Sequence, residues 1–261
     1  MELNLKNKTF AVAASTKGIG WGIAKTLLEE GSNVGMCSRS TQNIALLKQR
    51  LTPYGGRSII SQTDMGSQEQ ITEWLKKIIN TYERLDGIVI NAGGPPPGTF
   101  ETLAIEDWQN AFHLTLMSAV HMIREALPYL KENGGSILAV TSSSVKEPID
   151  NLLLSNVMRS GVTSLIKSVA TDFAKYGIRA NCIVPGIIDT DRVKSLDRLT
   201  ADHMGVSVEQ SRKNRENSIP IGRYGKIEEF GQAAAFLLSE AAAYISGVSF
   251  VVDGGKMKSI L

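Results

Sequence analysis

Two glycines near the amino terminus are spaced so that the backbone around them can lie against a phosphate group. Gly18 and Gly20 stand in the stretch AASTKGIGWGIAKTLLEEG, which follows an apolar run and opens an amphipathic one. In a strand–turn–helix setting, glycines let the backbone approach a pyrophosphate, whose negative charge is favoured by the positive end of the helix. This turn therefore predicts a dinucleotide-binding site.

The residues after the second apolar run indicate which dinucleotide would bind. An acidic residue there accepts hydrogen bonds from the ribose hydroxyls of NAD and repels the 2′-phosphate of NADP. This chain has Ser38 and Arg39 instead, and Lys17, directly before Gly18, adds a second cation on the same side of the turn. Arginine offers a phosphate a planar fork and lysine offers a point charge. The pattern favours NADP(H), the alternative being two solvated surface cations.

The turn lies within a chain of alternating apolar and amphipathic runs, which we expect to form the strands and helices that position it. Seven apolar runs read as strands, and most lack the polar alternation of a half-exposed strand. They are Thr9–Ala14, Asn33–Ser38, Ser58–Gln62, Leu85–Asn91, Gly135–Ser142, Ile178–Pro185 and Val248–Gly254. The helical patterns between them are Ile19–Glu30, Gln42–Leu51, Gln68–Thr81, Ile105–Glu132, Ser155–Tyr176 and Ile227–Ser239. Strict alternation predicts an α/β fold, in which residues 1–261 form one domain around a doubly wound, parallel, seven-stranded sheet.

The interval between the sixth and seventh expected strands is unusually long. Residues 191–226 carry eight lysines and arginines against five acidic residues, with poor periodicity until Ile227. Loops and short helices at the carboxyl end of such a sheet normally lie over the ligand crevice. We expect a mobile substrate lid here, the alternative being a solvated surface excursion.

Composition and charge narrow the class of protein. The 261 residues are 43% hydrophobic and 21% charged, which is typical of a globular domain. A formal charge of +2 does not indicate a nucleic-acid partner, and the chain shows neither a membrane-spanning apolar stretch nor a secretory signal pattern. Cys37 and Cys182, far apart in sequence, are expected to be buried thiols. We expect a cytoplasmic protein without a metal, nucleic-acid or membrane partner.

Further motifs occur in the order and spacing typical of one family. The Gly18–Gly20 turn is followed by INAGG, by VPGIIDT and, near the carboxyl terminus, by VVDGG. In these respects the whole chain resembles the short-chain dehydrogenases/reductases, although Ala14 stands where the family has its first turn glycine. A methyl group there narrows the backbone angles available to the turn. The resemblance implies a Rossmann-type fold that binds NADP(H) through Ala14, Ser15, Lys17, Gly18, Ile19, Gly20, Ser38, Arg39, Asp64, Asn91, Ala92, Gly93, Arg159, Pro185, Gly186, Ile188 and Thr190.

The resemblance also implies a reaction centre, where this chain departs from the family. Family members use a serine, a tyrosine, a lysine four residues after the tyrosine, and an asparagine in the preceding long helix. In this chain these catalytic positions fall on Ser142, Ser155, Arg159 and Thr115. Ser142 would still polarise a substrate oxygen, whereas Ser155 is shorter than tyrosine and a far weaker acid. Arg159 could bind ribose hydroxyls, but a guanidinium cannot relay a proton.

Two stretches place these departures in a subgroup. SSVKEPIDNLLLSNVMRSG and NAGGPPPGTF resemble a subgroup described as like 3-oxoacyl-acyl-carrier-protein reductases, whose members have an imperfect glycine motif and lack the full catalytic set. A replacement acid could come from Lys146, Glu147 or Asp150 in the loop before the expected active-site helix, the alternative being that these charges belong to a solvated loop.

Three hypotheses for function follow. The leading one is an NADP(H)-dependent oxidoreductase that interconverts a carbonyl and an alcohol in a small molecule or an acyl thioester, a 3-oxoacyl thioester being one candidate. The others are a non-redox dehydratase or isomerase, and a non-catalytic NADP-binding sensor or oligomeric partner. The resemblance further implies a homotetramer built on the helices expected at Ile105–Glu132 and Ser155–Tyr176.

Overall fold

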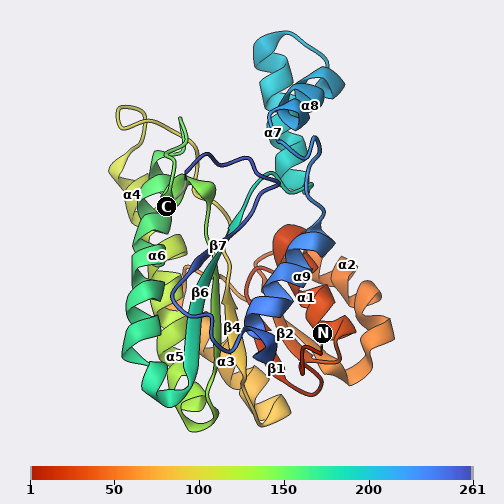
Figure 1. The fold of residues 1–261 in the computed structure, drawn as a ribbon, viewed down its shortest axis with the longest axis vertical. Coiled ribbons are helices and arrows are strands. Elements are labelled where there is room, and N and C mark those ends of the chain that lie inside the picture. The colour runs from red at the N-terminus through yellow and green to blue at the C-terminus, as the bar shows by residue number, and fades with distance from the viewer. Residues whose placement is uncertain (1, 260–261) are drawn as a thin grey trace.

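Seven parallel strands form the central sheet in this computed structural model, which describes residues 2–259 (Figure 1). The strands are β1 (Thr9–Val12), β2 (Asn33–Ser38), β3 (Ser58–Gln62), β4 (Gly87–Ile90), β5 (Gly135–Val140), β6 (Ile178–Pro185) and β7 (Ser249–Val252). Their order across the sheet is β3-β2-β1-β4-β5-β6-β7, and every pair is parallel. The doubly wound parallel sheet predicted from the alternating pattern is confirmed.

Helices cover both faces of this sheet. One hydrophobic core lies between the sheet and the helices α3 (Gln68–Tyr82), α5 (Ser118–Asn133) and α6 (Leu153–Asp172). The other lies between the sheet and α1 (Gly18–Glu29), α2 (Thr41–Leu51) and α9 (Ile227–Leu238). Short 3-10 turns occur at Thr52–Arg57, Ser143–Val145, Ala174–Tyr176 and Glu240–Ala242. The apolar runs lack polar alternation because helices cover the inner strands on both sides.

The order of the strands locates the ligand crevice. The chain runs outward from β1 to β2 and β3, then crosses back so that β4 pairs with the other edge of β1. Ligands in open α/β sheets bind outside the carboxyl ends of the strands at such a reversal. The segments after β1 and β4 therefore meet at the point where a dinucleotide is expected.

Several strands are shorter at their carboxyl ends than the apolar runs suggested. Thr9–Ala14 was expected as a strand, but β1 stops at Val12, because Ala14 turns the backbone to a φ of +47°. Gly135–Ser142 was likewise expected, but β5 stops at Val140, and Ser142 caps the following 3-10 turn. Both turns line the cavity at the carboxyl edge of the sheet.

The helix expected over Ile105–Glu132 is divided by a wider turn. The structure has α4 (Ile105–Ala111), a π-helical segment at Phe112–Met117 and then α5. Ser118 Oγ donates to Leu114 O at 2.6 Å, which competes with the regular backbone ladder at this place. Single π-helical turns inside α-helices frequently occur at functional sites.

Residues 191–226 are more helical than their pattern indicated. They contain α7 (Asp191–Met204) and α8 (Val208–Asn217), which project beyond the carboxyl edge of the sheet (Figure 1). Thr190 and Ser207 cap the two helices through their side-chain oxygens. An apolar stripe was not visible in the sequence because both helices are rich in polar and charged residues on most faces.

The described part of the chain contains no helix with the length and apolarity that a bilayer crossing requires. Cys37 and Cys182 are buried free thiols, as predicted.

Candidate active site

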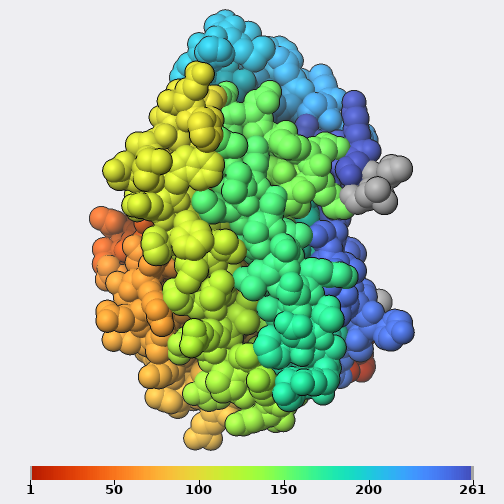
Figure 2. Space-filling view, turned by 90° about the vertical axis from the view of Figure 1, so that its left-hand side faces the viewer, coloured from red at the N-terminus to blue at the C-terminus, as the bar shows by residue number. Residues whose placement is uncertain are grey.

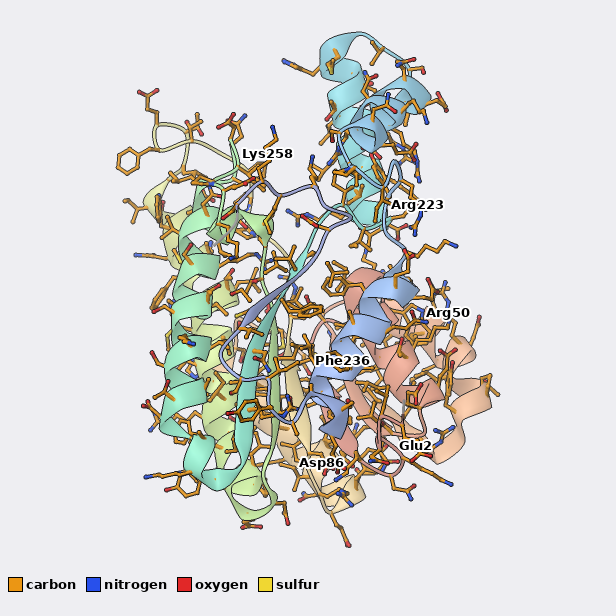
Figure 3. All side chains as sticks on the ribbon, in the orientation of Figure 1. Glu2, Arg50, Asp86, Arg223, Phe236 and Lys258 are labelled. Carbon is orange, nitrogen blue, oxygen red and sulfur yellow. The ribbon has the colours of Figure 1, made fainter. Side chains whose placement is uncertain are left out.

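A cavity of about 1380 Å³ runs along the carboxyl edge of the sheet. Its wall combines the turn after β1, the ends of β2, β4 and β5, one side of α6, the segment from β6 into α7, and the carboxyl-terminal segment. Figure 3 labels Lys258 on that last segment, which passes between the α4–α6 side and the α7–α8 side of the molecule. Small-molecule sites commonly occupy 300–1,000 Å³. The cavity therefore has room for more than one ligand.

The turn after β1 is held open toward the cavity by close backbone packing. A Cβ on Gly20 would lie 2.5 Å from Ala14 O and 2.9 Å from Ser15 Cα, so only glycine fits there. The Asn91 side-chain amide, from the end of β4, donates to Ala13 O at 3.1 Å and to Ala14 O at 3.3 Å. The carboxyl ends of β1 and β4 are thereby joined at the reversal of strand order.

Helix α1 begins directly behind this turn. Lys17 is its N-cap residue and provides no side-chain hydrogen bond to the first backbone N–H groups. An uncapped helix start beside a glycine turn offers N–H groups and a positive dipole end to an anion. Lys17, Gly18, Ile19 and Gly20 all line the cavity.

The cations at the end of β2 lie where the sequence indicated. Ser38 and Arg39 line the cavity together with Lys17, and the adjoining Ser40 and Asn43 at the start of α2 add polar atoms that the sequence analysis did not identify. An N-cap serine after a strand was a usable signal for Ser40. This corner can hold a phosphate between a guanidinium, an ammonium and hydroxyl groups.

Three residues expected at the site do not line the cavity. Ser15 is completely buried, and its Oγ donates to Val12 O at 2.7 Å, so it stabilises the turn from below. Asp64 lies 4.0 Å from Arg39 and accepts a hydrogen bond from Gly66 N, while its neighbours Thr63 and Met65 reach the cavity. Thr115 is 4% exposed within the π-helical segment, and its hydroxyl has no hydrogen-bond partner among the described residues.

The other expected residues lie in the cavity wall. They are Ala14, Lys17, Gly18, Ile19, Gly20, Ser38, Arg39, Asn91, Ala92, Gly93, Ser142, Ser155, Arg159, Pro185, Gly186, Ile188 and Thr190. Their sequence separations are large, and the carboxyl ends of β1, β2, β4, β5 and β6 bring them together. The motif positions thus converge on one crevice.

The end of β5 and one side of α6 form the wall opposite the glycine turn. Ser142 Oγ accepts a hydrogen bond from Ser144 N at 3.1 Å, which leaves its own hydrogen available. Beside it, the Thr141 side chain is 3% exposed, and its Oγ1 has no partner within the described chain. Ser155 and Arg159 face the same cavity from successive turns of α6. This wall can offer neutral hydroxyl donors to a ligand oxygen.

Arg159 carries a positive charge into this wall. Its Nη1 donates to Val140 O at 2.9 Å. Burial, and to a smaller degree the nearby charge of Arg192, lower the pKa of Arg159 to about 10. It remains protonated near neutral pH, and its other N–H groups are available to a ligand.

The charged loop before α6 is used differently from what the sequence suggested. Of Lys146, Glu147 and Asp150, only Glu147 lines the cavity. Its Oε1 accepts hydrogen bonds from Lys258 N at 2.9 Å and from Ser259 N at 2.7 Å. Glu147 therefore fastens the carboxyl-terminal segment across the cavity.

The segment after β6 contributes residues that the sequence analysis included in the expected lid without naming them, and the carboxyl-terminal segment contributes residues that it missed. Asp191, Arg192, Val193 and Leu196 from α7 line the cavity, as do Lys256, Met257 and Lys258 from the carboxyl-terminal segment. Arg192 stands two residues after the expected turn that ends at Thr190, and that proximity was the available signal. Lys256 and Lys258 come after the last strand and had no local pattern to mark them.

Buried polar contacts hold α7 and α8 together. Asp197 is 1% exposed and accepts hydrogen bonds from Arg215 at 2.6 Å and from the Tyr224 hydroxyl at 2.9 Å. Burial and the hydrogen bond to Asp197 raise the pKa of Tyr224 to about 12. The two helices therefore form one unit beside the cavity.

Comparison with known proteins places the chain among reductases. Residues 13–256 match the family described as enoyl-(acyl carrier protein) reductase. The NADPH-dependent reductase BacG of Bacillus subtilis (strain 168) is 30% identical over 259 residues, covering 98% of this chain and 100% of the relative. The 3-oxoacyl-[acyl-carrier-protein] reductase FabG of Chlamydia pneumoniae is 28% identical over 257 residues, covering 98% and 99%. The crystal structure of L-sorbose reductase from Gluconobacter frateurii, complexed with NADPH and L-sorbose, superposes with a TM-score of 0.94 at 26% identity, covering 100% of both chains.

Proposed function

Because the chain belongs to the short-chain dehydrogenase/reductase family, we propose that it is an NADPH-dependent reductase that interconverts a carbonyl and an alcohol. The observation that carries this proposal is one continuous cavity, which joins the Lys17–Arg39 corner to the wall that contains Ser142. A phosphate site and a neutral hydroxyl donor at opposite parts of one crevice suit a dinucleotide and a carbonyl compound bound together.

The wall residues fit NADP(H). Gly20 leaves no room for a side chain where a pyrophosphate would approach, and the start of α1 is uncapped. Lys17 and Arg39 supply two cations for a 2′-phosphate, and among the described residues that line this corner there is no carboxylate, although Asp64 lies 4.0 Å from Arg39 outside the lining. The likeness to the NADPH-dependent reductase of Bacillus subtilis and to the L-sorbose reductase complexed with NADPH supports the same assignment.

The chain's own residues have separate tasks in the reaction. Bound NADPH supplies the hydride. Ser142 donates a hydrogen bond to the carbonyl oxygen, and this bond strengthens as negative charge develops there. Hydride addition leaves an alkoxide, which takes its proton from solvent water to become the alcohol. Arg159, fixed to Val140 O, orients the nicotinamide ribose with its remaining N–H groups. Ser155 lines the same wall and adds a second neutral hydroxyl.

We also propose a substrate class. A 3-oxoacyl thioester is one candidate, supported by the likeness to the Chlamydia pneumoniae reductase and by the open length of the cavity. The α7–α8 unit is proposed to act as the lid, since Arg192, Leu196 and Arg215 from these helices line the cavity.

A homotetramer is the proposed assembly. Figure 2 looks onto the face made by α4, α5 and α6, coloured from yellow to green. Ile105 on α4, Phe112 in the π-helical segment and Val157 on α6 are exposed apolar side chains, with exposed fractions of 69%, 39% and 46%. Exposed apolar side chains on these elements favour an interface between subunits. The mass in solution, measured by light scattering, tests the proposal.

The reaction is tested by incubating the protein with NADPH and a panel of aldehydes, ketones and a 3-oxoacyl thioester. We expect loss of NADPH absorbance to match alcohol formed, measured by mass spectrometry. Replacing both Lys17 and Arg39 by Met should raise the KM for NADPH at least about tenfold. Arg50→Met is the matched control, because Arg50 (Figure 3) is an exposed cation of α2 outside the cavity. Product formed without NADPH loss would indicate a dehydratase or isomerase, and NADPH binding without any turnover would indicate a sensor; either result contradicts the proposal.

A further inference from the structure

The cavity carries more positive charge than the 2′-phosphate corner accounts for. Beyond Lys17 and Arg39, its basic lining residues are Arg159, Arg192, Arg215, Lys256 and Lys258, and its acidic ones are Glu147, Asp191 and Asp253. Two of these acids are engaged in holding the carboxyl-terminal segment. Glu147 accepts hydrogen bonds from Lys258 N and Ser259 N, and Asp253 accepts them from Gly255 N and Met257 N.

Two arginines at the reaction end are not neutralised by the protein. Within the described chain, neither Arg159 nor Arg192 lies within 4.0 Å of a carboxylate, whereas Arg215 is bound to Asp197. The charge of Arg192 contributes, after burial, to the lowered pKa of Arg159. Two like charges that converge on a crevice without an acidic partner favour an anion between them.

The geometry of Arg192 places its guanidinium on the reaction side of the crevice. A Cβ built on Gly94, in the loop after β4, would lie 2.6 Å from Arg192 Nη2. The side chain therefore reaches from the first turn of α7 across to the β4 end of the sheet. Arg159, its neighbour in charge, is fixed to β5 at Val140 O, two residues before Ser142. Thr190, two residues before Arg192, lies against the glycine turn, because a Cβ on Gly18 would be 3.5 Å from Thr190 Cγ2, so a pyrophosphate held at that turn is within the same stretch of wall as Arg192.

We propose that the substrate is a carbonyl compound that also carries a carboxylate, and that Arg192, assisted by Arg159, binds this carboxylate beside the Ser142 wall. The proposal rests on the proposed reductase function. A guanidinium offers a planar fork that pairs with both oxygens of a carboxylate, which suits two converging arginines better than a neutral ketone would. The other oxyanion that could meet Arg192 is the cofactor's pyrophosphate, and the experiment must separate the two.

The test compares acids with their neutral esters. The probes are 2-oxopentanoate and 4-oxopentanoate, each beside its methyl ester, with NADPH as the reductant. We expect kcat/KM for at least one acid to exceed that of its ester about tenfold or more. Arg192→Met should lower kcat/KM for that acid by about 10- to 100-fold, mainly through KM, as expected for the loss of a charge-assisted hydrogen bond. In the same variant, kcat/KM for the ester and the dissociation constant of NADPH should each change less than about twofold. Arg198→Met is the matched control, because Arg198 is an exposed arginine of the same helix outside the cavity.

A binding experiment tests carboxylate recognition by Arg192 independently of reductase activity. Each acid and ester is titrated calorimetrically into the enzyme–NADP⁺ complex, in which no hydride is available. Tighter binding of an acid than of its ester, lost in Arg192→Met and kept in Arg198→Met, supports the inference even if turnover is slow. Equal binding of acid and ester in the parent, or a loss of NADPH affinity in Arg192→Met as large as the loss for the acid, would overturn it. An enzyme that prefers acids in binding but reduces no carbonyl compound would contradict the reductase function alone.

Discussion

Ala14 adopts a backbone conformation that favours glycine. Replacing it by glycine should therefore stabilise the folded protein. Its φ is +47°, directly after the last residue of β1. For a residue with a Cβ, the left-handed region costs roughly 1–2 kcal/mol. Glycine relieves this strain, but it also raises the conformational entropy of the unfolded chain, which offsets about 0.4–1 kcal/mol of the stability gained. Ala14→Gly should therefore raise the free energy of unfolding by about 1 kcal/mol.

The assay is urea unfolding of the protein without cofactor, followed by calorimetric titration with NADPH. Ala13→Gly is the matched control, since Ala13 is fully buried and is absent from the residues with positive φ among those described. The control should lose stability, because glycine adds unfolded-state entropy there without relieving any strain. If Ala14→Gly is no more stable than the parent, the strain assigned to this turn is absent and the reasoning fails. A gain in stability with unchanged NADPH affinity would show that the alanine destabilises the fold and does not contribute to NADPH binding.

Four further outcomes are expected. NADPH should bind at least about tenfold tighter than NADH in calorimetry, and Arg39→Asp should reverse much of that preference; equal affinities in the parent would contradict it. Ser142→Ala should slow hydride transfer in single-turnover kinetics by up to about 10²–10³-fold, and an unchanged rate would remove Ser142 from the reaction centre. Residues 191–226 should gain protection from hydrogen exchange when NADP⁺ and substrate bind, whereas unchanged exchange would make them simple surface. Ser155→Tyr combined with Arg159→Lys should speed single-turnover reduction of a 3-oxoacyl thioester, because the pair restores an acid of suitable reach; a rapid parent that loses activity in this variant would show a different working mechanism.

The sheet was predictable because its signals are local and repeated. Each strand is a short apolar run, and the helices between them carry regular amphipathic patterns, so alternation alone led to the parallel order. Residues 191–226 lack such local signals. Helix α8 has one buried residue, Ser211, and most of its side chains are polar. The sequence therefore contains no apolar stripe that would predict this helix. Its position depends on contacts such as Arg215 with Asp197, which join separate helices and leave no local pattern.

The site was predictable where a motif sets the backbone, and less so where a side chain must point in a given direction. Gly20 follows from the steric demand of the turn, and Asn91 from its place at the end of β4. Thr115 was assigned from the position of the family's asparagine in the long helix, but the structure has a π-helical segment there, and Leu114 lines the cavity whereas Thr115 does not. A wider helical turn of this kind depends on local packing that periodicity does not record.

With Ser155 and Arg159 assigned, as we propose, to the family's tyrosine and lysine positions, the cavity also receives positive charge from elsewhere in the chain. Arg159 brings a permanent cation to a position from which a proton can no longer be passed on, and Arg192 adds a second cation from α7. The carboxyl-terminal segment adds Lys256 and Lys258, held in place by Glu147 across a separation of more than a hundred residues. Under the proposed function, such a site would hold an anionic substrate against hydroxyl donors rather than titrate a proton. Its rate then depends on orientation and electrostatic stabilisation, since these contributions survive when a positioned acid is removed.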